Sequence, residues 1–271
     1  MTKVLSQMSL DSKNLEIGMT IPVVGRILNE RRARFLKSIS HDRFEISIHG
    51  FRHEDFSALP EGLLKEDIRR AKKTFEDFGF STTGYRAPYL RSGGGLLHLL
   101  SELGFTYSSS VTTIFNHSTS ENRVLLERCD KIALDVYGAR PTAAEPVPNH
   151  LENGAIEIPV SLPDDEILID RIGISGDTLL KSVLKDIIYE SLRVNSYAVI
   201  QIHPERYPIF RNALLPLIEE MKRDAGVRFI SLSELSKRLH PQITQTAVAG
   251  KTRFICITGD LDIMSLRDLL R

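Results

Sequence analysis

The sequence predicts an α/β protein built on a parallel sheet, either open or closed into a barrel. Short apolar runs typical of buried strands alternate with longer segments of helical periodicity along most of the 271 residues. Polar residues capable of chemistry directly follow several of these predicted strands. Parallel α/β folds gather their reactive groups at such strand ends.

The first hundred residues show this alternation most clearly. Strands are predicted over residues 19–24, 44–48, 82–85 and 105–110. Helices are predicted over residues 4–10, 27–39, 63–78 and 96–103. In the third helix, apolar residues recur at helical spacing from Leu64 to Phe78, and Gly79 ends it.

The second half of the chain begins with an irregular region. Residues 111–154 contain several prolines and predict long loops that hold one strand, 131–136. Strands then follow over residues 155–160, 198–202, 227–231 and 254–257. Helices are predicted over residues 178–194, 209–221, 231–239, with Ser231 or Ser233 as cap, and 265–270.

Composition excludes several classes of protein. Apolar residues make up 42% of the chain, enough for a packed core, and 35 basic residues balance 35 acidic ones without a long basic run, which argues against nucleic-acid binding. No apolar segment reaches the roughly 18 residues of a membrane span. The first ten residues lack the order of a secretion signal, so we expect a cytoplasmic location. Of the two cysteines, Cys256 lies in an apolar run and is expected in the core.

Two histidines mark the candidate site. His49 and His53 follow the predicted strand 44–48 and stand four residues apart, so both rings can face one point. A strand that ends in paired nitrogen ligands can begin a metal site. Taken alone, the pair is explained equally well as two polar residues on an exposed turn.

Further polar residues follow other predicted strands, namely Arg86, His203, Asp260 and Asp262. Each has a simpler explanation of its own. Arg86 could pair with a surface carboxylate, and His203 could simply end a strand. Asp260 and Asp262 could cap the helix near Ser265. Together they fit metal-assisted hydrolysis. Two histidines and one carboxylate leave a metal position open for water, a second carboxylate accepts a proton, and a separate histidine protonates the leaving group.

Three motifs resemble those of a known family. His49-Gly-Phe-Arg-His53, Arg86-Ala-Pro-Tyr89 and Ile200-Gln-Ile-His203-Pro204 are similar, in order and spacing, to motifs of polysaccharide deacetylases with the NodB homology domain (carbohydrate esterase family 4). Ile156-Glu-Ile-Pro159 with Asp164-Asp165 resembles a loop of that family. The resemblance implies a distorted, TIM-like (β/α) barrel, usually of seven strands. It also implies a divalent metal, most often zinc, and removal of an acetyl group from an N-acetylated sugar.

Roles for individual residues follow from the same resemblance. His49 and His53 would be metal ligands, and Arg86 would orient the catalytic aspartate. Tyr89 would give its backbone N–H to the oxyanion site, and His203 would be the general acid. Substrate contacts would come from Pro88 and from Ile200, which would line a pocket for the acetyl methyl group.

The sequence departs from the family in the position of the first motif. Residues 1–43 contain no strand with an aspartate pair, whereas Ile257-Thr-Gly-Asp260-Leu-Asp262 resembles that motif. We expect a circular permutation of one domain, 1–271, in which residues 240–252 are a linker and 253–271 supply the first strand and helix. Asp260 would then be the base and Asp262 the third ligand. An alternative is a tail that crosses to another subunit of a homo-oligomer.

A second departure is the absence of tryptophan. In the family, a tryptophan and an aspartate often support the histidine that acts as the general acid. Asp135 is a candidate for that aspartate, although capping explains it equally well. With only 7% aromatic residues, the chain favours a short or lipid-linked sugar over a polymer. Two other functions stay open: hydrolysis of C–N bonds in small cyclic amides, and non-catalytic carbohydrate binding.

Overall fold

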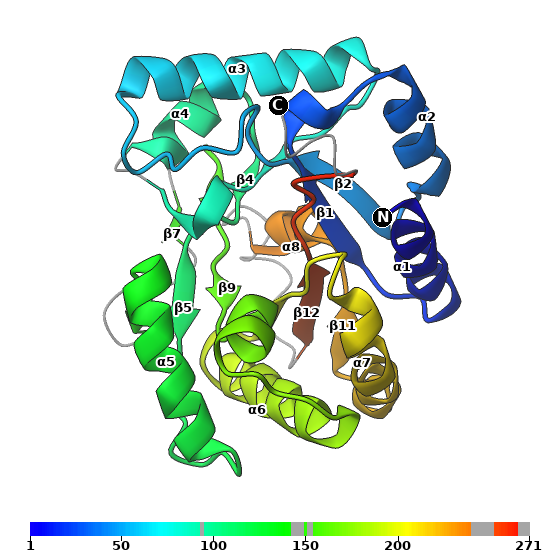
Figure 1. Ribbon diagram of the computed structural model, residues 1–271, viewed down its shortest axis with the longest axis vertical. Helices are drawn as coiled ribbons and strands as arrows, with labels where there is room; N and C mark the ends of the chain where they lie inside the picture. Colours follow the sequence, from blue (N-terminus) through cyan, green and yellow to red (C-terminus); the bar gives the residue numbers. More distant parts are fainter. Residues whose placement is uncertain (93–94, 142–148, 151–153, 240–251, 265–271) are drawn as a thin grey trace.

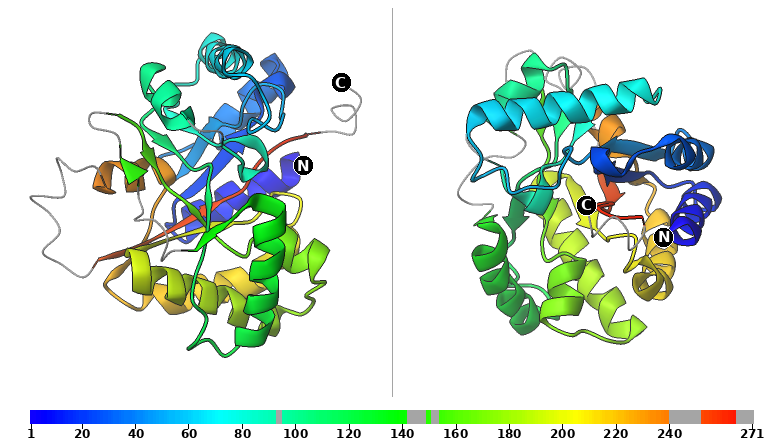
Figure 2. Two further views of the ribbon diagram at one scale, coloured as in Figure 1. Left: turned by 90° about the vertical axis from the view of Figure 1, so that its left-hand side faces the viewer. Right: turned by 45° about the horizontal axis from the view of Figure 1, so that its top comes forward.

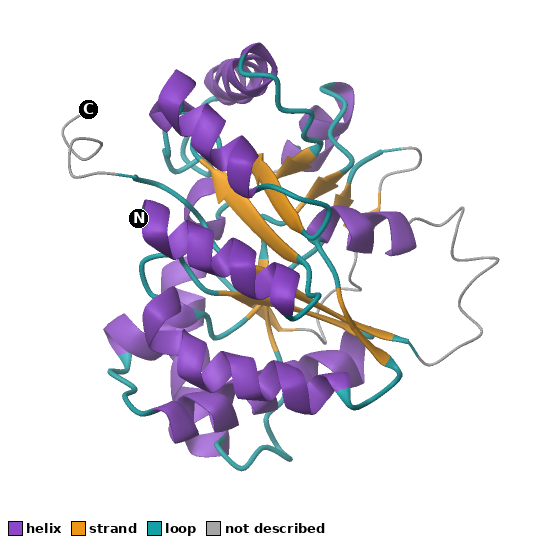
Figure 3. Ribbon diagram, turned by 90° about the vertical axis from the view of Figure 1, so that its right-hand side faces the viewer, coloured by secondary structure: helices purple, strands orange, loops and turns teal. Residues whose placement is uncertain are grey.

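A curved, mostly parallel sheet forms the centre of the molecule, and helices surround it (Figures 1 and 3). The computed structural model describes residues 1–92, 95–141, 149–150, 154–239 and 252–264. The predicted helix 265–270 and almost all of the predicted linker, residues 240–251, lie outside these ranges.

The helices confirm most of the predicted pattern. They are α1 Thr2–Asn14, α2 Glu30–Ile39, α3 Glu61–Asp77, α4 Leu96–Glu102, α5 Arg123–Tyr137, α6 Asp177–Asn195, α7 Tyr207–Lys222 and α8 Leu232–Leu239. Shorter helical turns are η1 Gly25–Ile27, η2 Pro88–Leu90 and η3 Glu166–Arg171. Among the described helices, none is long and apolar enough to cross a membrane.

The strands are short. They are β1 Met19–Val23, β2 Phe44–Ile48, β3 Gly84–Tyr85, β4 Tyr107–Ser108, β5 Thr112–Ile114, β6 Arg140–Pro141, β7 Asn149–His150, β8 Ile156–Glu157, β9 Val160–Ser161, β10 Tyr197–Gln201, β11 Val227–Phe229 and β12 Arg253–Thr258. Strands β1 to β4, β8 and β10 to β12 lie where the apolar runs predicted them, whereas β5, β6 and β7 lie in the region predicted as loops. All five residues of β1 and of β10 are buried. Burial on both faces is typical of a parallel sheet that helices cover.

The main sheet has the strand order β10-β12-β1-β2-β3-β4-β8-β7, and β11 also pairs with β12. Only β7 pairs antiparallel in this set. A smaller parallel sheet, β6-β5-β9, continues the curve, and its strand β9 contacts β10 at the far edge of the main sheet. The strands therefore form the half-barrel of the predicted (β/α) type.

The strand nearest the C-terminus lies in the interior of this sheet. Strand β12 pairs in parallel with β10 on one side and with β1 and β11 on the other. In both views of Figure 2, the red C-terminal segment runs through the body of the molecule beside the blue N-terminal part. Directly after it, Gly259 is required because a Cβ atom there would lie 1.9 Å from the carbonyl oxygen of Ile202. The prediction of a buried strand over residues 254–257 is confirmed, and this strand lies beside β1.

The prediction for residues 131–136 is wrong, because they belong to helix α5. Leu126, Cys129 and Ala133 recur at helical spacing and are buried against the core. Gly138, with φ of 60°, adopts the left-handed conformation that ends the helix. The nearby prolines belong to the segment that follows the helix.

Helix α8 covers the end of the sheet opposite to the strand ends that bear the histidines. Its Leu232 N–H donates to Thr20 Oγ1 at 2.9 Å, and its Ser233 N–H donates to Glu45 Oε2 at 3.0 Å. Thr20 and Glu45 lie near the starts of β1 and β2. The first turn of α8 is therefore tied to the inside of the sheet by side chains of the two strands.

Candidate active site

The carboxyl ends of the central strands open into one pocket of about 620 Å³. His49, His53, His203, Asp260 and Asp262, which were predicted from the sequence, all line it. Its other walls are Glu54, Asp55, Tyr89, Leu90, Arg91, Val136, Tyr137, Glu166, Arg171 and Gln201. Residues from the two ends of the chain therefore meet at one site, as the predicted permutation requires.

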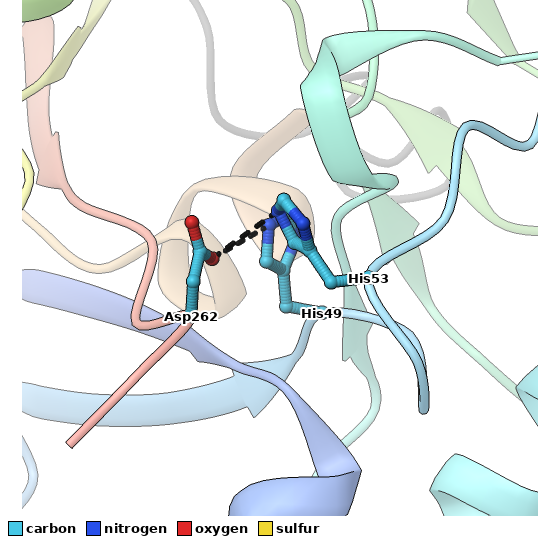
Figure 4. A group of neighbouring side chains, drawn as sticks. All are labelled: His49, His53 and Asp262. Carbon is cyan, nitrogen blue, oxygen red and sulfur yellow. Dashed lines mark ion pairs between the residues drawn. The ribbon is translucent and has the colours of Figure 1, made fainter. Parts of the chain in front are cut away.

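Two imidazoles and one carboxylate converge in this pocket (Figure 4). Asp262 Oδ1 lies 3.4 Å from His49 Nε2 and 3.3 Å from His53 Nε2. One potential ligand atom from each residue lies within 4.8 Å of the others. The three side chains thus aim at a common point from the loop after β2 and the segment after β12.

The ring of His49 is held in one orientation by the neighbouring strand. Its Nδ1 makes a 3.0 Å hydrogen bond with the backbone oxygen of Arg86, which requires the proton to be on Nδ1. Its Nε2 atom is then the one turned toward Asp262 and Asp260. Burial and the nearby His49 lower the pKa of His53 to about 4, so the His53 ring is neutral at physiological pH and can act as a ligand.

Asp260 is a buried carboxylate that is paired with a buried arginine. Arg86 Nη1 donates to Asp260 Oδ1 at 3.1 Å and to Gln201 Oε1 at 2.8 Å. Two further bonds, to the backbone oxygen and the hydroxyl of Ser109 at 2.8 Å each, fix the guanidinium plane. Burial would raise the pKa of Asp260, but the charges of Arg86 and His49 outweigh it and lower the pKa below its usual value. Asp260 is therefore ionised at neutral pH.

His203 pairs with an aspartate on the opposite side of the pocket. Its Nδ1 lies 2.8 Å from Asp165 Oδ1, and its backbone N–H donates to Asp165 Oδ2 at 2.7 Å. Burial would lower the pKa of His203, but the charge of Asp165 and its hydrogen bond raise it to about 10. The partner of His203 is thus Asp165, in the loop that resembles the family, and the candidate Asp135 lies exposed on helix α5 instead.

Pro88, Tyr89 and Leu90 form the turn η2, of which Tyr89 and Leu90 line the pocket. Pro88 is buried, whereas the Tyr89 ring is 49% exposed and lies 4.6 Å, centroid to centroid, from the ring of His53. Tyr89 and Leu90 have φ of 60° and 52°, a left-handed conformation that costs about 1–3 kcal/mol per residue. The turn presents this strained backbone at the pocket.

Neither of the residues predicted to contact the substrate, Pro88 and Ile200, lines the pocket. Ile200 lies in β10 in register with Ile257 and is buried, but it does not line the pocket, whereas its neighbour Gln201 does. Successive side chains of a strand point to opposite faces, so only one of the two can face the site. Gln201 Nε2 lies 3.4 Å from Asp260 Oδ2 and 3.3 Å from His203 Nε2. The alternation of polar Gln201 and His203 with apolar Ile200 and Ile202 was the signal that could have identified it.

The residues present fit a divalent metal. Two imidazoles with one carboxylate are a typical donor set for Zn²⁺ that leaves a coordination position open. Asp262 Oδ1 is buried and accepts no hydrogen bond, although buried carboxylate oxygens normally have partners. A cation bound between the three side chains would satisfy this atom.

The half-barrel carries carboxylates, histidines and an arginine at its strand ends, which is the arrangement that the resemblance to the deacetylases implies. Residues 12–108 match the family model described as polysaccharide deacetylase. The resemblance to this family, predicted from three motifs, is confirmed. The match contains His49, His53, Arg86 and Tyr89, whereas His203, Asp260 and Asp262 lie beyond it.

Several solved structures share the fold of this chain. A putative polysaccharide deacetylase from Mycobacterium smegmatis is 19% identical, with 88% of this chain and 77% of that chain covered and a TM-score of 0.58. A probable polysaccharide deacetylase from Pseudomonas aeruginosa PAO1 is 18% identical, with 88% and 74% covered and a TM-score of 0.62. Puue allantoinase is 17% identical, with 87% and 72% covered and a TM-score of 0.59. No curated protein matches the sequence.

Proposed function

We propose that this protein is a metal-dependent hydrolase that removes the acetyl group from an N-acetylated sugar. The observation that carries the proposal is the position of Asp262 between His49 and His53, next to the Asp260–Arg86 pair. This arrangement places a candidate cation site and a candidate proton acceptor side by side in one pocket. The family match over residues 12–108 supplies the reaction class.

In this proposal His49, His53 and Asp262 would hold a divalent metal in the pocket, and their donor chemistry favours Zn²⁺. A bound divalent cation supplies Lewis acidity, which polarises an acyl carbonyl and lowers the pKa of water. The neutral state of His53 favours this role, because protonation would block its lone pair.

The remaining residues handle protons and charge. Asp260, ionised and oriented by Arg86, accepts the proton of the attacking water. The backbone N–H of Tyr89 stabilises the negative charge that develops on the acyl oxygen. His203, kept protonated by Asp165, donates a proton from Nε2 to the departing sugar nitrogen.

The pocket rim favours an uncharged part of the substrate near the reacting amide. Arg91 pairs with Asp55 at 2.8 Å, and Arg171 pairs with Glu166 at 3.0 Å, so the charges of both rim arginines are compensated. Tyr89 is the exposed ring that a sugar face can contact. An N-acetylated saccharide, short or lipid-linked, is the proposed substrate, and a cytoplasmic location is proposed from the sequence.

Acetate release from N-acetylated sugars by the zinc-loaded protein tests the proposal. The Asp260→Asn variant should lower kcat/KM by about 10²–10⁴-fold, because it cannot accept the proton. Asp135→Asn is a matched control on exposed helix α5 and should retain wild-type activity. Unchanged acetate release by Asp260→Asn would remove it as the base, and absence of any acetate release by the metal-loaded wild type would favour non-catalytic binding.

A second candidate reaction uses the same residues on another substrate. The fold is shared with Puue allantoinase, and the sequence left the hydrolysis of small cyclic amides open as a reaction. Parallel assays with acetylated sugars and with small cyclic amides distinguish the two reactions, since only the first releases acetate.

A further inference from the structure

Asp67 is a charged residue in the apolar face of helix α3. The helix buries Leu64, Ile68, Ala71 and Phe75, and Asp67 lies in the same stripe with 1% of its surface exposed. A carboxylate in such a position is costly unless hydrogen-bond donors surround it. The hydrogen-bond donors around Asp67 therefore indicate why this position of α3 holds a carboxylate.

The donors that meet Asp67 come from the loop between the two histidines. The Phe51 N–H donates to Asp67 Oδ2 at 2.7 Å, and Arg52 Nε donates to Asp67 Oδ1 at 3.3 Å. These two donors are the residues immediately before His53. Asp67 thus holds the main chain and one side chain of the loop that carries a proposed ligand.

The opposite side of the loop is held by the turn η1. The N–H groups of Gly25 and Arg26 donate to the carbonyl oxygens of Gly50 and Phe51 at 2.9 and 3.0 Å. From α3, the guanidinium of Arg70 lies 3.9 Å from the centroid of the Phe51 ring. The loop is therefore clamped between η1 and α3.

The loop needs this clamp because its backbone is strained. Gly50 and His53 have φ of 69° and 50°, in the left-handed region, which an L-residue such as His53 adopts only when its surroundings hold it there. A Cβ on Gly50 would lie 2.9 Å from the Phe56 ring and 3.3 Å from Asp67 Oδ2. Close packing around Gly50 and the bonds to Asp67 together fix the direction of the His53 side chain.

We infer that Asp67 is a positioning residue that sets the affinity of the site formed by His49, His53 and Asp262 for its cation. The inference rests on the metal site of the proposed function. Asp67 does not touch the cation position; it lowers the cost of ordering the loop before the cation binds. Residues that orient metal ligands in this way typically contribute 10–100-fold to metal affinity.

Zinc titration against a chromophoric chelator, without substrate, tests the inference on the full chain. Asp67→Asn keeps the size of the side chain but loses its charge and turns an NH₂ group toward a donor, so the Kd for Zn²⁺ should rise about 10–100-fold. Asp77→Asn is the matched control, since Asp77 is exposed on the same helix and pairs only with nearby Lys73 at 2.9 Å in the described structure; its Kd should be unchanged.

A second readout separates loop position from general stability. With Co²⁺ in place of Zn²⁺, Asp67→Asn should change the ligand-field absorption spectrum, because His53 is displaced, whereas Asp77→Asn should not. A folded Asp67→Asn protein with the wild-type Kd and spectrum would overturn the inference.

A further variant covers the case in which Asp67→Asn does not fold. Arg52→Gln removes the weaker donor to Asp67 and leaves the helix intact. It should raise the Kd in the same direction by a smaller factor, and a wild-type Kd in Arg52→Gln would then count against the inference. Failure of the wild-type protein to bind Zn²⁺ would overturn the proposed metal site together with the inference, whereas a selective failure in the variants leaves the proposed function standing.

Discussion

The pair His203–Asp165 sets how the molecule responds to alkaline pH. The pKa of His203 rises from 6.5 to about 10 in the folded protein because Asp165 binds Nδ1, and a raised histidine pKa stabilises the fold in the protonated state. This stabilisation is complete below about pH 6.5 and declines as the pH rises through 10. A protonated His203 is also what the proposed acid role requires.

The variant Asp165→Asn should remove both effects. At pH 6 the variant should have a lower free energy of unfolding than wild type, and at pH 10 this difference between variant and wild type should be smaller. The alkaline limb of the kcat/KM profile should move to lower pH by about 1–3 units. Urea unfolding at the two pH values and a pH–rate profile measure these quantities. An alkaline limb that stays in place would show that His203 is not the group that titrates there.

Residues with a motif could be predicted, and residues defined only by contacts could not. His49, His53, Arg86 and His203 stand in recognisable local patterns. Asp67 and Gln201 have no such pattern: their importance comes from hydrogen bonds to residues distant in the sequence, which only the folded chain brings near. Asp165 stands in a loop that resembles the family, but its pairing with His203, 38 positions away along the chain, is visible only in the folded protein.

At the scale of elements, the contact of α8 with the sheet depends on one half-buried carboxylate, that of Glu45. Glu45 accepts hydrogen bonds from Thr20 Oγ1 at 2.9 Å, the Ser233 N–H at 3.0 Å and Tyr107 Oη at 2.8 Å. These donors belong to β1, α8 and β4, so Glu45 ties three elements to β2. Loss of this acceptor would leave buried donors without a partner.

Glu45→Ala should therefore destabilise the fold by roughly 2–3 kcal/mol. The control Glu102→Ala removes an exposed ion pair with Lys65 and should cost less than about 1 kcal/mol. Urea titrations of both variants give the two free energies. Equal small losses in the two variants would mean that Thr20, Tyr107 and α8 find other partners.

Elements with strong periodicity were predicted almost to the residue, as for β2 and for α3. Helix α5 was missed because the prolines and polar residues around it dominate the region, while its own apolar spacing is modest. The small strands β5 to β9 were predicted only in part, because strands of two or three residues carry too few positions for an alternation to show.

At the scale of the whole molecule, we propose that the chain is a circular permutation of the deacetylase arrangement. Strand β12 lies between β10 and β1, and the segment after it carries Asp260 and Asp262 into the pocket. Leu261 N–H donates to the Pro22 oxygen at 2.8 Å, which fixes this segment along β1. Its alternation places both aspartates on the same side of the segment.

Deletion of residues 253–271 should abolish cooperative unfolding, because it removes an interior strand and opens the apolar core. Asp262→Asn is the control that keeps β12 but lacks a proposed ligand; it should unfold cooperatively and bind Zn²⁺ much more weakly. Circular dichroism during urea unfolding, together with zinc titration, distinguishes the two outcomes. A truncated chain with a wild-type unfolding transition would show that β12 is dispensable for the fold.

The interior position of β12 also has a consequence for how the molecule is made. The ribosome synthesises β1 and β10 before β12, which lies between them in the sheet. The backbone hydrogen-bonding groups on the facing edges of β1 and β10 therefore have no strand to pair with in the nascent chain. Until residues 253–262 emerge from the ribosome, those edges can pair with other chains. The pocket also lacks Asp260 and Asp262 until then. The site can therefore assemble only after residues 253–262 have been made.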